Sequence, residues 1–380
     1  MAEELNENQA NLEQEVNIEE SDRIIFSCPS CGAALMFDPS SQKMTCPYCS
    51  SEVDIEHTKI GIAEKNFNAG LKLEGEDWAG DNISVKCEQC GATTIVDTYN
   101  LSSKCAFCGS PNIKKIDNLT GIKPESLIPF KIQKAKAEEL FTKWIKRKLF
   151  APNKIRKHQE IIEMKGIYIP HWTYDSDTYS AYTAQAGEYY YVTETDWVEE
   201  NGKRKMVTKR VRKTRWYPVS GDYSVFFDDI LINASKNVDN EIINKIEPFH
   251  FNELVKYKPD YLSGFGAERY SVDLNEGWKQ ARDNIDGSIR HGVTQKINAD
   301  EVRSLRVNTT YKNITYKHLL LPIWISSYKH GKKAYNFMVN GQTGEVQGKA
   351  PVSALKVIGT ILAVAAIVTG IVFLKQYMGW

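Results

Sequence analysis

The longest apolar run of the chain lies near its C-terminus. Residues 357–374 contain no charged side chain, and eleven of these 18 residues are Val, Ile, Leu or Phe. On the membrane-insertion scale those eleven side chains contribute roughly −3 to −6 kcal/mol. A helix of this length measures about 27 Å, close to the ~30 Å hydrocarbon layer of a bilayer. The run therefore predicts one transmembrane helix, residues 357–374, flanked by Lys356 and Lys375.

A helical pattern also opens the middle part of the chain. In residues 133–150, apolar side chains recur at spacings of three and four, at Leu140, Phe141, Trp144, Ile145 and Leu149. We expect an amphipathic helix with these side chains on its buried face. The opposite face is rich in lysine. It suits contact with phosphate, with anionic lipid or with water, and water is favoured because a run of charge usually marks a solvated surface.

A long hairpin is predicted around Asn201-Gly202, the strongest short signal for a two-residue turn. This turn sets the register of residues 188–200 against residues 203–215, because paired residues must have numbers that sum to 403, as Glu194 and Lys209 do. Residues 203–215 hold eight bases. Alone they are typical of a nucleic-acid-binding arm, but the acidic strand opposite favours a ribbon that neutralises its own charge.

Further strands and helices are predicted on either side of this hairpin. Residues 168–172 and 320–324 are similar apolar segments that end in Pro-x-Trp, and both are typical of strands. Residues 334–339 and 345–346 suit a closing hairpin, and residues 240–246 and 275–292 suit helices. Residues 121–351 are therefore expected to form an α+β domain with mostly antiparallel strands.

Eight cysteines near the N-terminus form two sets of the same design. Each set has two CxxC pairs separated by 14 residues, and an offset of 59 superposes one set on the other. The same offset pairs Gly32 with Gly91 and Tyr48 with Phe107, which indicates an internal duplication. The predicted metal ligands are Cys28, Cys31, Cys46, Cys49, Cys87, Cys90, Cys105 and Cys108.

This spacing lets four sulfurs reach one ion from two tight turns, with a short hairpin between them. We expect two zinc ribbons, residues 24–56 and 83–114, joined by a linker of residues 57–82. Such small modules draw their folding energy from metal, because they bury too little apolar surface. Four sulfur ligands leave no open position for water, so the two Zn²⁺ ions are predicted to be structural.

Charge and composition refine this picture. Hydrophobic residues make up 42% of the chain and charged residues 25%, which excludes a wholly disordered protein. The net charge is zero, but residues 1–22 carry eight acids and no base, which leaves +8 on the remainder. Residues 1–23 are predicted to form an acidic disordered tail, without the pattern of a signal peptide.

The distribution of lysines predicts how the chain lies in a membrane. Five lysines precede the apolar run within about 30 residues and Lys375 follows it, so we expect a single-pass protein of the cell membrane with its N-terminal region in the cytoplasm. Paired CxxC motifs agree with a reducing compartment. Small residues at Gly359, Ala363, Ala366 and Gly370 permit close helix contact, which leaves a homo-oligomer open.

Enzyme motifs are missing from the sequence. It contains no P-loop, no dinucleotide-binding glycine pattern, no GxSxG and no HExxH. His171 near Asp175 and Asp177 is the best acid/base candidate, but a histidine between Pro and Trp in a strand more often packs in a core. We therefore predict no catalytic residue, no cofactor other than zinc, and no enzymatic activity.

These residues together resemble a family of bacterial TFIIB-type zinc-ribbon proteins with two ribbons, a middle domain and a C-terminal membrane helix. The resemblance rests on the eight cysteines, residues 127–130, 166–172, 261–268, 321–324 and 340–344. Some members are similar to a membrane protein encoded beside phage-shock protein A and an SPFH-domain protein. The resemblance implies a membrane platform that recruits such soluble proteins during envelope stress.

The sequence thus favours a zinc-binding, membrane-anchored adaptor or scaffold that presents its zinc ribbons to protein partners in the cytoplasm. The alternative is a membrane-associated zinc-ribbon protein that binds nucleic acid. A third hypothesis, a hydrolase in the middle domain, has no motif in its support. Binding that weakens steeply with salt would distinguish the nucleic-acid alternative from the adaptor.

Overall fold

The computed structural model describes residues 26–56, 63–73, 83–96, 104–116, 121–153, 163–200, 203–330 and 333–378. The predicted acidic tail and the Asn201-Gly202 turn lie outside the described residues. The fold is α+β, as predicted, and most strand pairs of its large sheet are antiparallel. A separate three-stranded sheet lies near the N-terminus.

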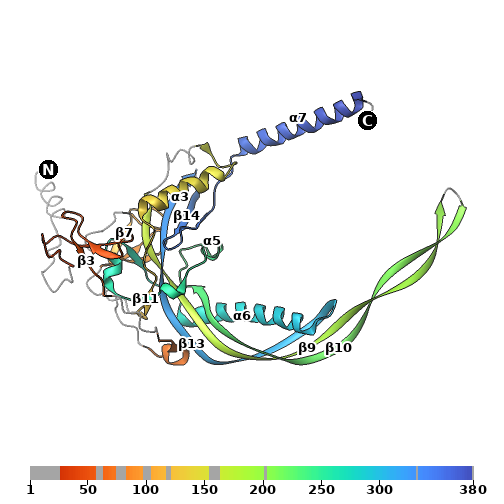
Figure 1. The fold of residues 1–380 in the computed structure, drawn as a ribbon, viewed down its shortest axis with the longest axis horizontal. Coiled ribbons are helices and arrows are strands. Elements are labelled where there is room, and N and C mark those ends of the chain that lie inside the picture. The colour runs from red at the N-terminus through yellow and green to blue at the C-terminus, as the bar shows by residue number, and fades with distance from the viewer. Residues whose placement is uncertain are drawn as a thin grey trace, which may run out of the picture.

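Three long strands form the frame of the molecule (Figure 1). Strand β9 (Lys165–Glu200) lies between β10 (Lys203–Asn233) and β13 (Glu301–His330), and both neighbours are antiparallel to it. Pairing with β13 begins at Gly187, so beyond this residue β9 and β10 continue as a twisted two-stranded ribbon. We call this ribbon the arm. It extends far from the rest of the fold (Figure 1).

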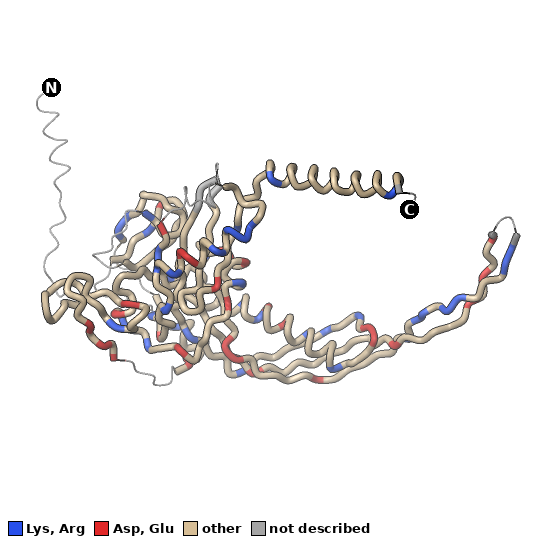
Figure 2. The backbone as a smooth tube through the Cα atoms, turned by 45° about the horizontal axis from the view of Figure 1, so that its top comes forward, with Lys and Arg blue, Asp and Glu red and all other residues tan. Residues whose placement is uncertain are grey.

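The register of the arm is the one that the Asn-Gly turn predicts. Glu200 pairs with Lys203 and Glu194 with Lys209, and residue numbers continue to sum to 403 as far as Ser176 and Phe227. The hairpin is therefore much longer than the predicted 28 residues. Its charges do neutralise one another: Lys209 forms an ion pair with Asp196, and Lys213 with Glu194, both at 2.8 Å. Figure 2 shows both signs of charge along the arm.

Helix α6 (Leu274–Ile297) covers one face of the three-stranded part of the sheet. Its N-cap is Asp273, whose carboxylate accepts a hydrogen bond from the Glu276 N–H, and it ends at Asn298 in the left-handed conformation. Ala281, Ile285 and the other buried side chains of α6 lie in one core cluster with large aromatic rings of the sheet. That cluster includes Trp172, Tyr174, Tyr182 and Tyr316. The predicted helix of residues 275–292 is thus confirmed and slightly longer.

The other end of the sheet forms the body of the protein. Residues 168–172 of β9 pair directly with residues 318–322 of β13, so the two similar Pro-x-Trp segments are neighbouring strands. Beside them lie β8 (Ser126–Leu127), β11 (Val255–Lys256), β14 (Lys333–Asn340) and β15 (Val346–Gly348). Strands β14 and β15 form the predicted closing hairpin. Helix α5 (Asn240–Lys245) and the 3-10 helices η2 (Phe251–Glu253) and η3 (Pro259–Leu262) complete the body.

Helix α3 (Lys134–Arg147) confirms the amphipathic helix predicted there, with one difference. Phe141 and Ile145 are buried, and the Phe141 ring stacks on Phe337 at 3.7 Å between centroids. Leu149, predicted for the same buried face, is 73% exposed because the helix ends at Arg147. Several bases of α3 are paired: Glu139 forms ion pairs with Lys136 and Lys143, and Lys134 with Glu163.

Part of the predicted linker belongs to the folded body. Strand β4 (Lys65–Asn66) pairs with β13, and the single turn α2 (Phe67–Gly70) follows it. The Phe67 side chain is buried against Tyr174 and Trp278. This segment, which lies between the two ribbons in the sequence, is therefore part of the core below α6.

The C-terminal helix α7 (Ala354–Met378) contains the predicted transmembrane run. Its segment Ala354–Lys375 is long and apolar enough to cross a membrane, and none of that segment is buried by the rest of the protein. Figure 2 shows basic residues at the two ends of α7 and uncharged residues between them. The helix projects away from the body, as a membrane anchor would.

Candidate metal centres

Four turns of the same design hold the eight cysteines. In each turn the first cysteine C=O accepts a hydrogen bond from the N–H four residues on, at Gly32, Ser50, Gly91 and Gly109. Each first cysteine also donates its own N–H to the carbonyl five residues on. The four residues that donate to the first cysteine's carbonyl, Gly32, Ser50, Gly91 and Gly109, all have a positive φ, including Ser50 at 59°. The turn thus needs the left-handed conformation even where the sequence lacks glycine.

These turns bring the sulfurs into two groups of four. Within each group the sulfurs lie within 4.8 Å of one another. The closest pairs are Cys28 with Cys49 at 3.4 Å and Cys87 with Cys108 at 3.6 Å. A disulfide needs about 2.05 Å, whereas tetrahedral zinc with Zn–S bonds of about 2.3 Å separates its sulfurs by about 3.8 Å. The cysteines are free thiols in a geometry that fits one zinc ion per group.

The electrostatics of the groups also fit a cation. Burial is the largest cause of the raised pKa of the Cys90 thiol, and the charge of Cys105 raises it further, against the backbone hydrogen bond from Ala92, which lowers it. Four thiols that must all lose their protons to bind metal repel one another as thiolates, and Zn²⁺ removes that repulsion. Zinc held here would supply folding energy, because both groups lie at junctions between short strands.

The first ribbon forms its own sheet and packs on the body. Strands β1 (Met36–Asp38), β2 (Lys43–Thr45) and β3 (Glu52–Val53) are antiparallel. The Phe37 ring lies edge-on to Tyr261, with centroids 5.2 Å apart. The Ser263 hydroxyl donates to the Leu35 carbonyl at 2.7 Å. These contacts fix the ribbon against the turn at η3.

The second ribbon is continuous with the large sheet. Strand β5 (Ile83–Cys87) lies between β6 (Thr93–Val96) and β7 (Ile113–Ile116), and β6 pairs with β12 (Gly266–Glu268). Strand β12 in turn runs parallel to β9, with Ala267 beside Tyr168. Cys87, Cys105 and Phe107 belong to the same core cluster as Ile167 and Ile169. The second metal group therefore borders the main core.

A cleft of about 850 Å³ lies where the two ribbons meet the body. The first ribbon contributes Met36 and Phe37, the second contributes Val96, and the body contributes Phe265 and Trp324. Lys104, Lys134 and Lys165 add polar positions. Concave sites that combine apolar side chains with polar groups are the usual form of a binding site, and Cys105 of the second metal group also lines this cleft.

The sequence-derived acid/base candidates do not form a joint site. His171 is buried and its Nδ1 lies 3.0 Å from the Ile169 carbonyl oxygen. Asp175 accepts hydrogen bonds from the Asp229 N–H and the Thr315 hydroxyl, and Asp177 accepts one from Asn313. No hydrogen bond among the described residues joins the histidine to either carboxylate.

A third group of possible ligands was not predicted from the sequence. Carboxylate oxygens of Glu64, Asp175 and Asp228 lie within 4.8 Å of one another. Burial raises the pKa of Asp175 to about 6. The ammonium of Lys317 already lies in this group, 3.3 Å from Glu64 and 2.8 Å from Asp229. The adjacent acids Asp228 and Asp229 are the one feature of this group that the sequence shows locally. Glu64 and Asp175 reach them through strand pairing between distant parts of the chain, which the sequence does not indicate.

Comparison with known proteins gives one informative similarity. The chain is 29% identical over 338 residues to YdjG of Bacillus subtilis (strain 168), which is described as uncharacterized. The aligned part covers 88% of this chain and 92% of YdjG. No protein-family model matches the sequence, and no solved structure is significantly similar. Because the alignment spans most of both chains, the likeness concerns the whole molecule and not its cysteines alone.

Proposed function

We propose that this protein is a zinc-binding membrane adaptor. Helix α7 anchors it in the cell membrane, and two structural zinc ions hold a rigid surface for a protein partner in the cytoplasm. The proposal is supported by an exposed apolar helix and two four-cysteine groups on one folded body. It acts by binding, without catalysis. The resemblance noted from the sequence implies an envelope-stress setting, with phage-shock protein A-like or SPFH-domain proteins as partners.

One observation carries the proposal: the cleft between the ribbons and the body has walls from both zinc ribbons. Beside the first metal group, Tyr48 exposes 82% of its surface although it lies in a metal-binding turn. An exposed aromatic ring on a rigid turn loses little conformational freedom on binding, and such residues are enriched where proteins meet. The ribbons therefore offer a preorganised contact surface rather than flexible appendages.

The nucleic-acid alternative has less support. The basic strand of the arm is engaged with its partner strand, through ion pairs of Lys209 and Lys213 and through guanidinium groups stacked on tyrosines. Arg210 lies over Tyr191 and Arg212 over Tyr189, each within about 4.2 Å of the ring centroid. Bases held in this way are less free to neutralise phosphates.

Affinity capture of the full chain from detergent-solubilised membranes tests the proposal. We expect wild type to retain specific proteins that are lost in Cys87→Ser/Cys90→Ser and in Tyr48→Ser. Tyr179→Ser is the matched control, because Tyr179 is 52% exposed but lies on the sheet of β9, away from the ribbons. Nuclease treatment should leave the captured proteins unchanged. An identical set of proteins from wild type and the Tyr48 variant would contradict the proposal.

A further inference from the structure

An unpaired strand edge runs beneath α6. Residues 306–312 of β13 pair regularly with β9 on one side and are bounded by two register shifts, at Arg303/Arg306 and at Lys312/Thr315. The other partners of β13 within the described residues, β4, β8 and β14, begin at Thr315 or later. The seven-residue segment therefore has one free edge, and such edges readily accept another strand.

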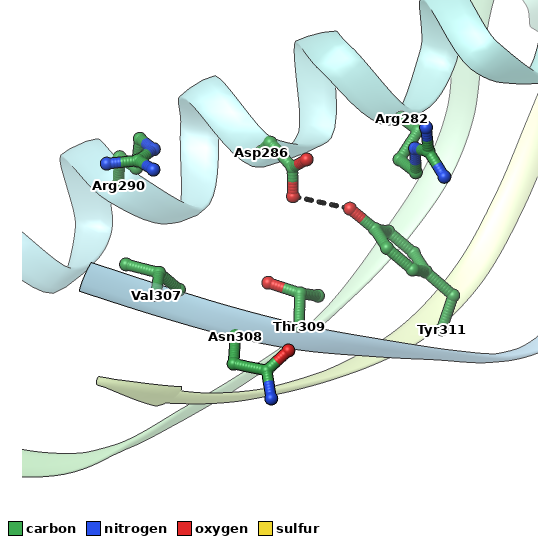
Figure 3. A pocket seen from close by; sticks show the side chains of 7 residues that line it. All are labelled: Arg282, Asp286, Arg290, Val307, Asn308, Thr309 and Tyr311. Atoms are coloured by element: carbon green, nitrogen blue, oxygen red, sulfur yellow. Dashed lines mark hydrogen bonds between the residues drawn. The ribbon is translucent and has the colours of Figure 1, made fainter.

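A polar pocket of about 290 Å³ lies between this edge and α6. Figure 3 shows three α6 side chains opposite three β13 side chains along the pocket: Arg290 lies near Val307, Asp286 near Thr309, and Arg282 near Tyr311. The Tyr311 hydroxyl donates to Asp286 at 2.5 Å. Among the described residues, neither guanidinium forms an ion pair with a carboxylate, and Arg290 makes only a 3.5 Å contact with the Leu305 carbonyl.

The two arginines define a spacing along the edge. They are eight residues apart on α6, which is about 12 Å along a helix. In a strand, residues i and i+4 lie about 13 Å apart and point to the same face. A strand added to β13 would thus place acidic side chains at i and i+4 against Arg290 and Arg282. The residue between them, i+2, would face Asp286 and must be neutral or basic.

The N-terminal part of this chain contains that pattern. Residues 15–19 read Glu-Val-Asn-Ile-Glu, with acids four apart, an amide midway and β-branched residues at the alternate positions. β-Branched residues favour strands, and the eight acids without a base in residues 1–22 complement the positive charges of Arg282 and Arg290. We infer that the free edge of residues 306–312 binds residues 15–19 of a neighbouring copy of this chain as an added strand.

Photo-cross-linking of the full chain in lipid nanodiscs tests this inference. A benzoylphenylalanine replaces Asn17, and mass spectrometry maps the products. We expect the main product to be a cross-linked dimer that joins position 17 of one copy to β13 or α6 of a second copy. The double variant Arg282→Glu/Arg290→Glu should lower its yield about tenfold, since two exposed attractions become repulsions. Lys279→Glu, an exposed α6 substitution away from the pocket, should leave the yield unchanged.

Charge exchange makes the test independent of folding effects. Adding Glu15→Arg and Glu19→Arg to the Arg282→Glu/Arg290→Glu chain should restore the product, which a misfolded chain could not do. Arg282→Gln/Arg290→Gln, a milder change at exposed positions, should give an intermediate yield. The inference is overturned if position 17 links elsewhere, or if the yield is the same in wild type and in both double variants.

Discussion

Tyr48 and Phe107 occupy equivalent positions in the two zinc ribbons, yet Tyr48 is 82% exposed and Phe107 is 3% exposed. Each is the third residue of the second CxxC turn, and the offset of 59 that relates the cysteines also relates these rings. Both copies of the duplicated ribbon thus have an aromatic ring at this position, but the surroundings of the two rings differ. In the second ribbon the ring packs into the core of the large sheet, and in the first it faces solvent.

The two rings should respond differently to truncation. Phe107→Ala removes a buried ring and should lower the free energy of unfolding by about 3–5 kcal/mol, whereas Tyr48→Ala should change it by about 0.5 kcal/mol or less. Thermal or denaturant unfolding of the purified protein in detergent measures both. If Tyr48→Ala destabilised as much as Phe107→Ala, the first ribbon could not present that ring to a partner.

Loss of metal should likewise have unequal effects. We expect two zinc ions per chain by metal analysis of the purified protein, and a value clearly below one would contradict both sites. Cys87→Ser should raise hydrogen exchange at Ile167 and Ile169, because β6 and β12 connect that ribbon to β9. Cys31→Ser should raise exchange mainly in β1 and β2, whose sheet is separate. Equal exchange at Ile167 in the two variants would argue against this connection.

Local signals explain most of what the sequence predicts correctly. Asn201-Gly202 sets the arm's register because turn geometry and the two-residue period of a strand leave one pairing. CxxC spacing determines the metal groups in the same way, and periodicity locates α3, α5, α6 and α7. Each of these depends on residues close together in the chain.

Long-range pairing explains what the sequence does not reveal. No local pattern indicates that β6 joins β9 through β12, or that Phe67, from a segment that reads as a linker, packs on Trp278. The partners lie between about 100 and 210 residues apart, and several β-strands could equally have accepted these edges. For Leu149 the local pattern is misleading: its spacing fits the buried face of α3, but the helix ends at Arg147, two residues before it.

Acid should destabilise the body through His171. Burial lowers the pKa of His171 to about 4 and that of His318 to about 3, so both are neutral in the folded protein at pH 6. The unfolded chain, with histidine pKa values near 6.5, binds more protons below that pH, and the free energy of unfolding must fall as the pH falls from about 6.5 to 4.

His171→Asn keeps a donor for the Ile169 carbonyl and removes the titrating ring, so unfolding should depend less on pH in this window. His291→Asn, on the exposed face of α6, is the control. The midpoint of thermal unfolding measured from pH 7 to pH 5 checks the difference. Identical pH profiles for wild type and His171→Asn would show that another group governs acid stability.

Nucleic-acid binding, if measured, should be weak and should depend little on salt. With Lys209 and Lys213 in ion pairs and Arg210 and Arg212 stacked on tyrosines, half of the eight bases in residues 203–215 already have partners and are less available to release counterions. Fluorescence anisotropy with labelled duplex DNA or RNA from about 50 to 200 mM salt tests this. A fall in affinity of about 10³-fold or more over that range would instead indicate six or more phosphate contacts.

Two charges placed within α7 should release the protein from the membrane. One arginine at the centre of a transmembrane helix costs about 2.5–3.5 kcal/mol, so Ala363→Arg/Ile367→Arg adds about 5–7 kcal/mol to an insertion energy of roughly −3 to −6 kcal/mol. Both sites are within the exposed apolar segment and contact no other element, so the body should fold as before. The control, Ser353→Arg/Leu355→Arg, places the same charges at the helix start, where they reach water. Alkaline extraction of membranes should leave the control variant in the pellet and the central variant in the supernatant. If the central variant also stayed in the pellet, a surface other than α7 would hold the protein to the membrane.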